Sequence, residues 1–277
     1  MEGLRLVNVV CNLVPNSDLS QFFIQQINRI LDDFIQNGMM NHNKTIPSCS
    51  NCKHTLSGES LLCSLTNDEL EVVGKEKRDM FFKKGQVIFN EGNHPHGIYC
   101  IHKGKVKIHK MGEEGKDQIV RLAKENNFIG YRSILSNDAY MASATAIEDT
   151  EVCFIAKDKI LRLIKTNPNF SFSLLELLSD DLKRAENKIT NMAQKHVKER
   201  IAETILLLKE AYGYQEDGES IDSSLTRKEI ASIAGTTTET SIRILSDFQK
   251  QKMIELDGKK IKIKNLQELI KTANIFD

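Results

Sequence analysis

Residues 225–248 read LTRKEIASIAGTTTETSIRILSDF, and this stretch decides the fold of the C-terminal part of the chain. Its pattern predicts two short helices, at about 227–234 and 238–250. Gly235 lies between them, where the left-handed backbone that ends a helix favours glycine. Two short helices joined by a glycine-containing turn are typical of a helix-turn-helix.

Each of these helices is predicted to begin with a capping box, in which a threonine hydroxyl and a glutamate carboxylate bond each other's backbone N–H groups. The two pairs are Thr226–Glu229 and Thr236–Glu239. Apolar faces would hold the helices together. The predicted faces are Ile230, Ile233 and Ala234 on the first helix, and Ile242, Leu245 and Phe248 on the second.

A β-hairpin is predicted directly after the second helix. Residues 253–256 and 260–263 alternate with a period of two around Asp257 and Gly258. A hairpin in this place is the wing of a winged helix.

Lysines crowd this corner although the chain as a whole is neutral, with 38 Lys+Arg and 38 Asp+Glu. They are Lys250, Lys252, Lys259, Lys260, Lys262 and Lys264. A run of charge is often only a solvated face, but beside a helix-turn-helix it favours contact with DNA phosphates. Lys260 and Lys262 are the predicted phosphate contacts.

The second helix is predicted to read bases from its solvent face. That face would carry Thr237, Thr238, Glu239, Ser241 and Arg243. Arginine can donate two hydrogen bonds to guanine, and glutamate can accept one from cytosine. A Glu239–Arg243 pair could instead only stabilise the helix, by about 0.2–0.5 kcal/mol.

Between residues 171 and 212 the apolar pattern becomes helical. One narrow stripe has spacings of three and four residues, as in a heptad seam. It consists of Leu175, Leu178, Leu182, Ala185, Ile189 and Met192. Its charged flanks favour a partner helix in a dimer, although packing on the chain's own barrel stays open as an alternative.

Residues 79–156 contain many short apolar runs separated by glycine-containing turns, at intervals of roughly 8–12 residues. This pattern indicates an antiparallel barrel or sandwich. A further amphipathic helix is predicted at residues 17–37, before a polar linker that begins at Met39. Residues 1–38 are either an appendage before a natural start at Met39 or Met40, or a helix that packs on the body.

No stretch approaches the ~18 consecutive apolar residues that a membrane-spanning helix needs, and residues 1–14 lack the features of a signal peptide. We therefore expect a cytoplasmic protein without a membrane partner. Its six cysteines should then be reduced thiols or metal ligands rather than disulfides.

Three short motifs accompany the helix-turn-helix and the wing. They are Lys84-Gly-Gln-Val-Ile-Phe-Asn-Glu-Gly92, Gly97-Ile-Tyr-Cys-Ile-His-Lys-Gly104 and Phe128-Ile129-Gly130. With these motifs the chain resembles the CRP/FNR superfamily of bacterial transcription regulators over about residues 65–271. The resemblance is closest to the FNR-like branch in the pattern of cysteines.

The resemblance implies an α+β fold with an antiparallel β-roll, a long dimerisation helix and a C-terminal winged helix-turn-helix. The implied parts are an extension at 1–45, a cyclic-nucleotide-binding-like β-roll sensor at 46–165, the dimerisation helix at 166–195 and the DNA-binding domain at 196–277. It also implies a homodimer that binds double-stranded DNA and RNA polymerase.

The family's base-reading glutamate and arginine match Glu239 and Arg243. Thr238 stands at the position that varies with the operator. Ile242 stands where the oxygen-sensing branch usually has serine.

Members that bind cyclic AMP hold the ribose with the Glu of a Gly-Glu pair and the phosphate with the Arg of an Arg-Ser pair. Here Tyr131 stands at the Glu position, and Ala142-Ser143 stands at the Arg-Ser position. Arg132 lies on the wrong segment to replace that arginine. Without the cation a buried phosphate would lack its counter-charge, so we do not expect cyclic AMP as the effector.

The cysteines are similar to the cluster ligands of the oxygen-sensing members. Cys49, Cys52 and Cys63 precede the β-roll, and Cys153 matches the fourth ligand position. Four thiolates can hold a [4Fe–4S] cluster. The gap from Cys52 to Cys63 is longer than in the family, and zinc or no metal at all stay open. Cys11 and Cys100 are interpreted as structural.

Two other classes of function compete with a DNA-binding regulator. An enzyme is not expected, because the sequence has no phosphate-binding loop, no nucleophile elbow and no helical pair of metal-binding histidines. A regulatory subunit without DNA binding would leave the helix-turn-helix, the wing and the lysines unexplained.

Overall fold

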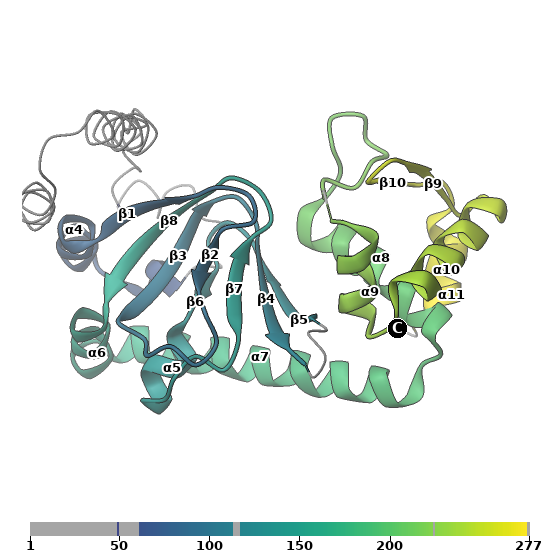
Figure 1. Ribbon diagram of the computed structural model, residues 1–277. Helices are drawn as coiled ribbons and strands as arrows, with labels where there is room; N and C mark the ends of the chain where they lie inside the picture. Colours follow the sequence, from purple (N-terminus) through teal and green to yellow (C-terminus); the bar gives the residue numbers. More distant parts are fainter. Residues whose placement is uncertain (1–48, 50–60, 113–116, 224, 276–277) are drawn as a thin grey trace, which may run out of the picture. The chain divides into compact units, whose positions relative to one another are not determined.

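The computed structural model describes residues 49, 61–112, 117–223 and 225–275 (Figure 1). Within them, short strands come first, a long helix follows, and a winged helix ends the chain. This order confirms the predicted fold class. The predicted helix at 17–37 and the linker after Met39 lie outside the described residues. No helix in the described part of the chain is long and apolar enough to cross a membrane.

Two four-stranded antiparallel sheets form the β-roll. The first has the order β1 (Arg78–Phe82), β8 (Thr150–Ala156), β3 (Gly97–Lys103) and β6 (Phe128–Ile129). The second has the order β2 (Val87–Phe89), β7 (Ser143–Ala146), β4 (Val106–Met111) and β5 (Asp117–Ala123). Strand β5 is therefore at the edge of its sheet, where one row of backbone N–H and C=O groups needs other partners.

Short helices accompany the roll and bury apolar residues with it. They are η1 (Leu61–Ser64), α4 (Asn67–Glu76), α5 (Tyr131–Ser136) and α6 (Lys157–Thr166). One cluster of buried side chains joins residues of η1, α4 and α6 to Ile98 of β3 and Ile155 of β8.

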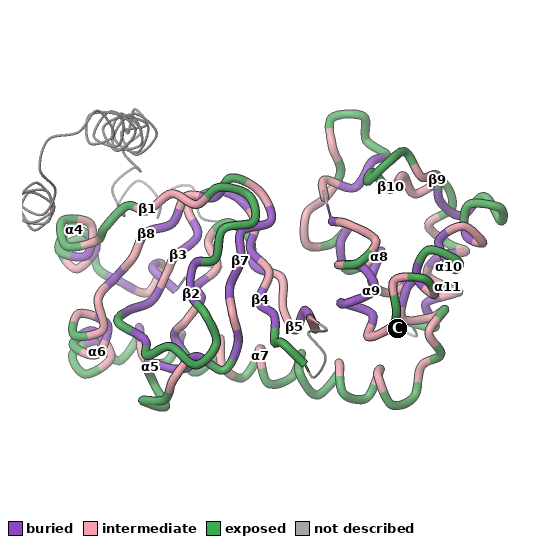
Figure 2. Tube along the Cα trace, viewed as in Figure 1, coloured by how far each residue is buried: buried purple, intermediate pink, exposed green. Residues whose placement is uncertain are grey.

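The long helix α7 spans Pro168–Gln194. Asn167 caps it by accepting a hydrogen bond from the backbone N–H of Phe170 (2.9 Å). Pro168 suits the first helical position, because a backbone N–H there would have no partner within the helix. Phe170 and Leu174 are buried in the roll's core. Much of the remaining helix is exposed or partly exposed (Figure 2).

The winged helix contains α8 (Val197–Tyr212), α9 (Arg227–Ala234), α10 (Thr238–Lys250), β9 (Ile254–Asp257), β10 (Lys260–Ile263) and α11 (Leu266–Ala273). The predicted bounds of α9 and α10 are confirmed. Strands β9 and β10 pair in antiparallel register, with Asp257 opposite Lys260, so the predicted hairpin turns at Gly258 and Lys259. The buried core of this domain also includes Ile119 of β5 and Ile147, which follows β7.

Candidate nucleic-acid interface

Helix α9 is buried along most of its length. The predicted capping box is present: the Thr226 hydroxyl accepts from the N–H of Glu229 (3.2 Å), and the Glu229 carboxylate accepts from the N–H of Thr226 (2.9 Å). All five residues from Ile230 to Ala234 are buried. A helix surrounded in this way supports its neighbours and offers little surface to a ligand.

Side-chain and backbone groups join α9 to the edge strand β5. The Ser232 hydroxyl accepts from the N–H of Ile119 (2.8 Å) and donates to the carbonyl of Asp117 (2.7 Å). The ammonium group of Lys188, on α7, donates to the carbonyls of Ile233 (2.9 Å) and Ile119 (3.3 Å). Burial lowers the pKa of Lys188. Backbone groups at the outer edge of β5 thus find hydrogen-bond partners in the winged helix and in α7.

The turn after α9 has the predicted left-handed glycine, with Gly235 at φ 64°. A Cβ atom at this position would lie 2.6 Å from the terminal methyl group of Met192. Arg200 of α8 donates to the carbonyls of Ala234 (2.8 Å) and Gly235 (3.2 Å). These bonds satisfy carbonyls that the end of a helix leaves without partners.

Helix α10 begins one residue later than the predicted second capping box allows. Its cap is Thr237, whose hydroxyl accepts from the N–H of Thr240 (3.2 Å). The prediction of a Thr236–Glu239 box was therefore wrong. The sequence has three successive threonines, and the length of the turn selects which of them caps the helix.

The two faces of α10 also differ from the prediction. The buried residues are Ser241, Ile244, Leu245 and Phe248. Ser241 has no exposed surface, whereas the Ile242 side chain is 51% exposed. Placing Ser241 on the solvent face and Ile242 in the core was wrong. The observed stripe through Ser241 and the predicted stripe through Ile242 both have helical spacing. Packing against the core of the winged helix therefore decides which of these two residues is buried.

The exposed face of α10 carries Glu239, Ile242 and Arg243, with Thr237 exposed at the cap and Thr238 half-buried. Glu239 and Arg243 lie one turn apart in the N-terminal half of the helix, where side chains of a recognition helix contact base edges. No described residue forms an ion pair with either side chain within 4.0 Å, so both remain available to a ligand.

The wing presents lysines next to this helix. Lys252, Lys259 and Lys260 are exposed, and Lys262 is half-buried. Lys264 is instead held by Glu219 (2.7 Å) and Glu255 (3.3 Å). Arg227 of α9 donates to the carbonyl of Gly258 in the wing turn (2.9 Å), which ties the wing to the helix-turn-helix.

Comparison with protein families gives a match for the β-roll and another for the winged helix. Residues 79–167 match the cyclic nucleotide-binding domain, and residues 199–272 match the Crp-like helix-turn-helix domain. The chain belongs to the CRP/FNR family.

Curated relatives and solved structures agree with this assignment. The CRP-like cAMP-activated global transcriptional regulator of Mycobacterium tuberculosis is 29% identical over 200 residues, which are 72% of this chain and 89% of the relative. The fumarate and nitrate reduction regulatory protein of Yersinia pestis is 29% identical over 207 residues, which are 74% and 82%. FixK2 from Bradyrhizobium japonicum shares the fold, with a TM-score of 0.65 at 22% identity over 73% of this chain and 99% of FixK2. This CRP/FNR protein is thus a transcription regulator.

In this CRP/FNR protein, the residue at the nucleotide-binding Glu position lies against the long helix. Tyr131 is buried, and its hydroxyl donates to the carboxylate of Asp181 on α7. Arg121 of β5 donates to the same carboxylate (3.2 Å). Burial raises the pKa of Tyr131 to about 12. A cation is thus present beside this position, which the sequence did not indicate, but a carboxylate already neutralises it.

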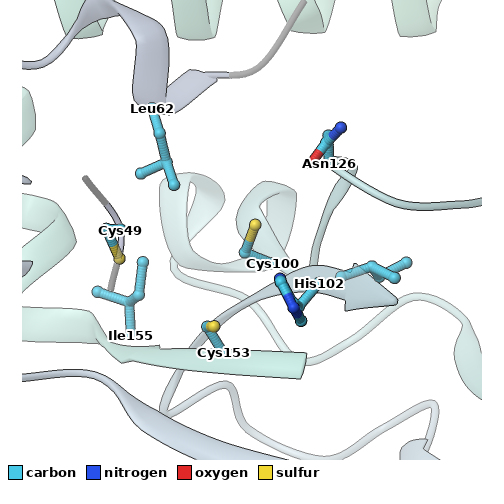
Figure 3. Close-up of a pocket in the computed structure, with 8 residues that line it drawn as sticks. Cys49, Leu62, Cys100, His102, Asn126, Cys153 and Ile155 are labelled. Atoms are coloured by element: carbon cyan, nitrogen blue, oxygen red, sulfur yellow. The ribbon is translucent and has the colours of Figure 1, made fainter. Parts of the chain in front are cut away.

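The cysteines of this CRP/FNR protein gather differently from the predicted ligand set. Cys49, Cys100 and Cys153 line one small pocket with His102, Leu62, Asn126 and others (Figure 3). Cys100 and Cys153 stand opposite each other on β3 and β8. Burial raises the pKa of Cys153 to about 12, which disfavours its thiolate.

Among the residues that the structure describes, the predicted cluster ligands are not all brought together. Cys63 is on η1 and does not line this pocket, although its neighbour Leu62 does. Cys52 lies outside the described residues. Among the described residues, no group of three or more His, Cys, Asp or Glu side chains is arranged to hold a metal ion. Cys100, interpreted as structural, is the thiol that accompanies Cys49 and Cys153.

Proposed function

We propose that this regulator works as a homodimer that reads a two-fold symmetric operator through α10. Glu239 and Arg243 contact base edges, and Lys260 and Lys262 contact the phosphates. Thr237 and Thr238 lie at the start of the helix, close enough to this face to contribute. The observation that carries the proposal is the free face of α10 beside exposed lysines, on a helix-turn-helix whose other helix is buried.

The experiment is a selection of binding sites from a randomised duplex library with the full-length protein. We expect two inverted half-sites whose centres are about 10–10.5 base pairs apart, because paired recognition helices enter successive major grooves. Arg243→Ala should weaken binding by about 1–3 kcal/mol per half-site and relax the base preference at one position. Lys124→Ala, an exposed change in the roll, is the control. Unchanged selectivity in Arg243→Ala would refute base reading by this residue.

The dimer would form along α7. Leu175, Leu182 and Ile189 of the predicted seam are 63%, 60% and 69% exposed. Ala185 is also exposed, whereas Leu178 packs partly on the roll's core and Met192 contacts the turn at Gly235. Solvated apolar side chains in a repeating stripe favour a partner helix of the same kind.

Sedimentation of a Leu182→Glu protein tests the dimer, because a charge in the seam would be desolvated on association. We expect the wild type to sediment as a dimer and the variant as a monomer with lower DNA affinity. The same change at exposed Leu135 of α5 is the matched control. A variant that stays dimeric would place the interface elsewhere. Contact with RNA polymerase stays a prediction from the resemblance.

Cyclic AMP is not the proposed signal. The Tyr131–Asp181–Arg121 group supports this view, because Arg121 could neutralise a phosphate only by leaving the Asp181 carboxylate, held in a buried position, without its cation. Calorimetry with cyclic AMP should show no binding. Binding that stimulates operator affinity would overturn this part of the proposal.

A redox or oxygen signal at the thiols is the second candidate, and the shared pocket of Cys49 and Cys153 favours it. Anaerobic purification followed by an absorption spectrum and assays of iron, zinc and sulfide tests this candidate. Iron and sulfide that are lost in Cys153→Ser but retained in Cys100→Ser would support a cluster. A colourless, metal-free protein would exclude an iron–sulfur cluster.

A further inference from the structure

Ile242 is a large apolar side chain on an otherwise polar reading face. It is 51% exposed on α10, one turn after Glu239 and directly before Arg243. The face of α10 that packs in the core of the winged helix contains Ser241, Ile244 and Leu245, and Ile242 lies outside this face. Isolated exposed apolar residues are common in proteins and need no explanation by themselves. The position of this one, between two candidate base-reading residues, is what calls for an explanation.

The spacing along the helix places Ile242 within reach of the bases if Glu239 and Arg243 are within reach. A helix rises about 1.5 Å per residue, so Ile242 lies about 4.5 Å further along the axis than Glu239. Successive base pairs are about 3.4 Å apart. A side chain at this position would therefore meet a base pair next to the one that Glu239 meets.

The chemistry of the side chain selects what it can recognise. A branched aliphatic group neither donates nor accepts hydrogen bonds, so it cannot complement the polar edges of guanine, adenine or cytosine. The one apolar group that a standard base presents in the major groove is the C5-methyl group of thymine. Packing two apolar groups together removes both from water, which favours binding.

We propose that Ile242 is a specificity-determining residue that packs against the C5-methyl group of a thymine in each half-site. This inference rests on the proposed function, because it requires α10 to lie in the major groove. It goes further in naming the base and the atom that are recognised. A hydroxyl-bearing residue in place of Ile242 would recognise the position differently.

The test replaces thymine by deoxyuridine, which removes the methyl group and retains the Watson–Crick edge and the O4 acceptor. Operators from the selection experiment are synthesised with one symmetric pair of thymines replaced at a time, and affinity is measured by fluorescence anisotropy. We expect one replaced pair to weaken wild-type binding about fourfold per half-site, or roughly fifteenfold for the dimer, from the transfer free energy of one buried methyl-sized group.

Two substitutions isolate the contribution of Ile242. Ile242→Ala and Ile242→Ser should bind the thymine and deoxyuridine operators with equal affinity. Leu207→Ala, which truncates an exposed leucine of α8, should keep the wild-type discrimination. Thermal unfolding of each variant checks that the fold is retained, as expected for an exposed position.

The outcomes separate this inference from the proposed function. If the selection yields no operator, the proposed function fails first. If an operator is selected but every deoxyuridine duplex binds the wild type as tightly as the thymine duplex does, the methyl contact is wrong. The inference is also wrong if Ile242→Ala discriminates as strongly as the wild type. In either case the exposed isoleucine would have to serve another contact, such as one with a protein.

Discussion

Helices α9 and α10 have closely similar local sequences but opposite environments. Each is short, begins after a threonine cap, carries a glutamate in its first turn and contains two isoleucines. In α9 all five residues from Ile230 to Ala234 are buried, whereas α10 leaves Glu239, Ile242 and Arg243 exposed. Local signals therefore make both helices, and their neighbours decide which one supports the domain and which one is free to bind.

The neighbour that distinguishes them is strand β5. As the edge of its sheet, β5 must satisfy backbone groups, and it does so through Ser232 of α9 and Lys188 of α7. Glu229 of α9 also pairs with Lys107 of β4 (2.7 Å). The β-roll thus packs against α9, the first helix of the helix-turn-helix, and leaves the exposed face of α10 open.

The largest expected effect is a difference in the free energy of unfolding between two isoleucine-to-alanine variants, one in α9 and one in α10. Ile230→Ala removes a side chain with no exposed surface and should lower the free energy of unfolding by about 2–5 kcal/mol. Ile242→Ala should change it by less than about 0.5 kcal/mol, because the side chain is already half in water. Urea denaturation followed by circular dichroism measures both. Equal losses of unfolding free energy in the two variants would mean that the two side chains are equally buried, which would contradict the difference between α9 and α10.

A smaller effect should follow from removing a hydroxyl. Ser232→Ala leaves the N–H of Ile119 and the carbonyl of Asp117 without their partner, at a cost of about 1–3 kcal/mol in the free energy of unfolding. Ser246→Ala, at a half-buried site on α10, is the matched control and should cost less than about 0.5 kcal/mol. Hydrogen exchange adds a local readout, since the amide of Ile119 should exchange faster only in Ser232→Ala. Unchanged exchange would show that Ser232 does not protect the edge strand.

The smallest effect concerns pH. Burial raises the pKa of Glu229, but hydrogen bonds from Lys107 and from the backbone of Thr226 outweigh it and lower the pKa below 4.5. The ionised carboxylate therefore stabilises the fold above about pH 4.5, and this contribution is lost as the pH falls through the lowered pKa.

In a thermal-unfolding series from about pH 6 to about pH 3, the wild type should consequently lose its advantage over Glu229→Gln as the pH falls. Glu239→Gln, which makes the same change on the exposed face of α10, is the matched control. A difference between wild type and Glu229→Gln that stays constant over this range would contradict the assignment.

The sequence by itself determined the features that depend on local interactions. The bounds of α9 and α10, the Thr226–Glu229 box, the left-handed Gly235 and the hairpin turn at Gly258 all follow from residues within a few positions of one another. The order of roll, long helix and winged helix followed from periodicity, because each kind of element imposes its own spacing on apolar residues.

Only the tertiary structure decided which of two adjacent stripes on α10 is buried, which threonine caps it, and which thiols share a pocket. Serine at 241 and isoleucine at 242 give no local reason for the hydroxyl to face inward, because hydrophobicity alone favours the reverse. Likewise, Cys100 meets Cys49 and Cys153 through strand pairing and helix placement across distant segments. These outcomes depend on contacts between residues far apart in the chain, and a pattern read within one segment cannot contain them.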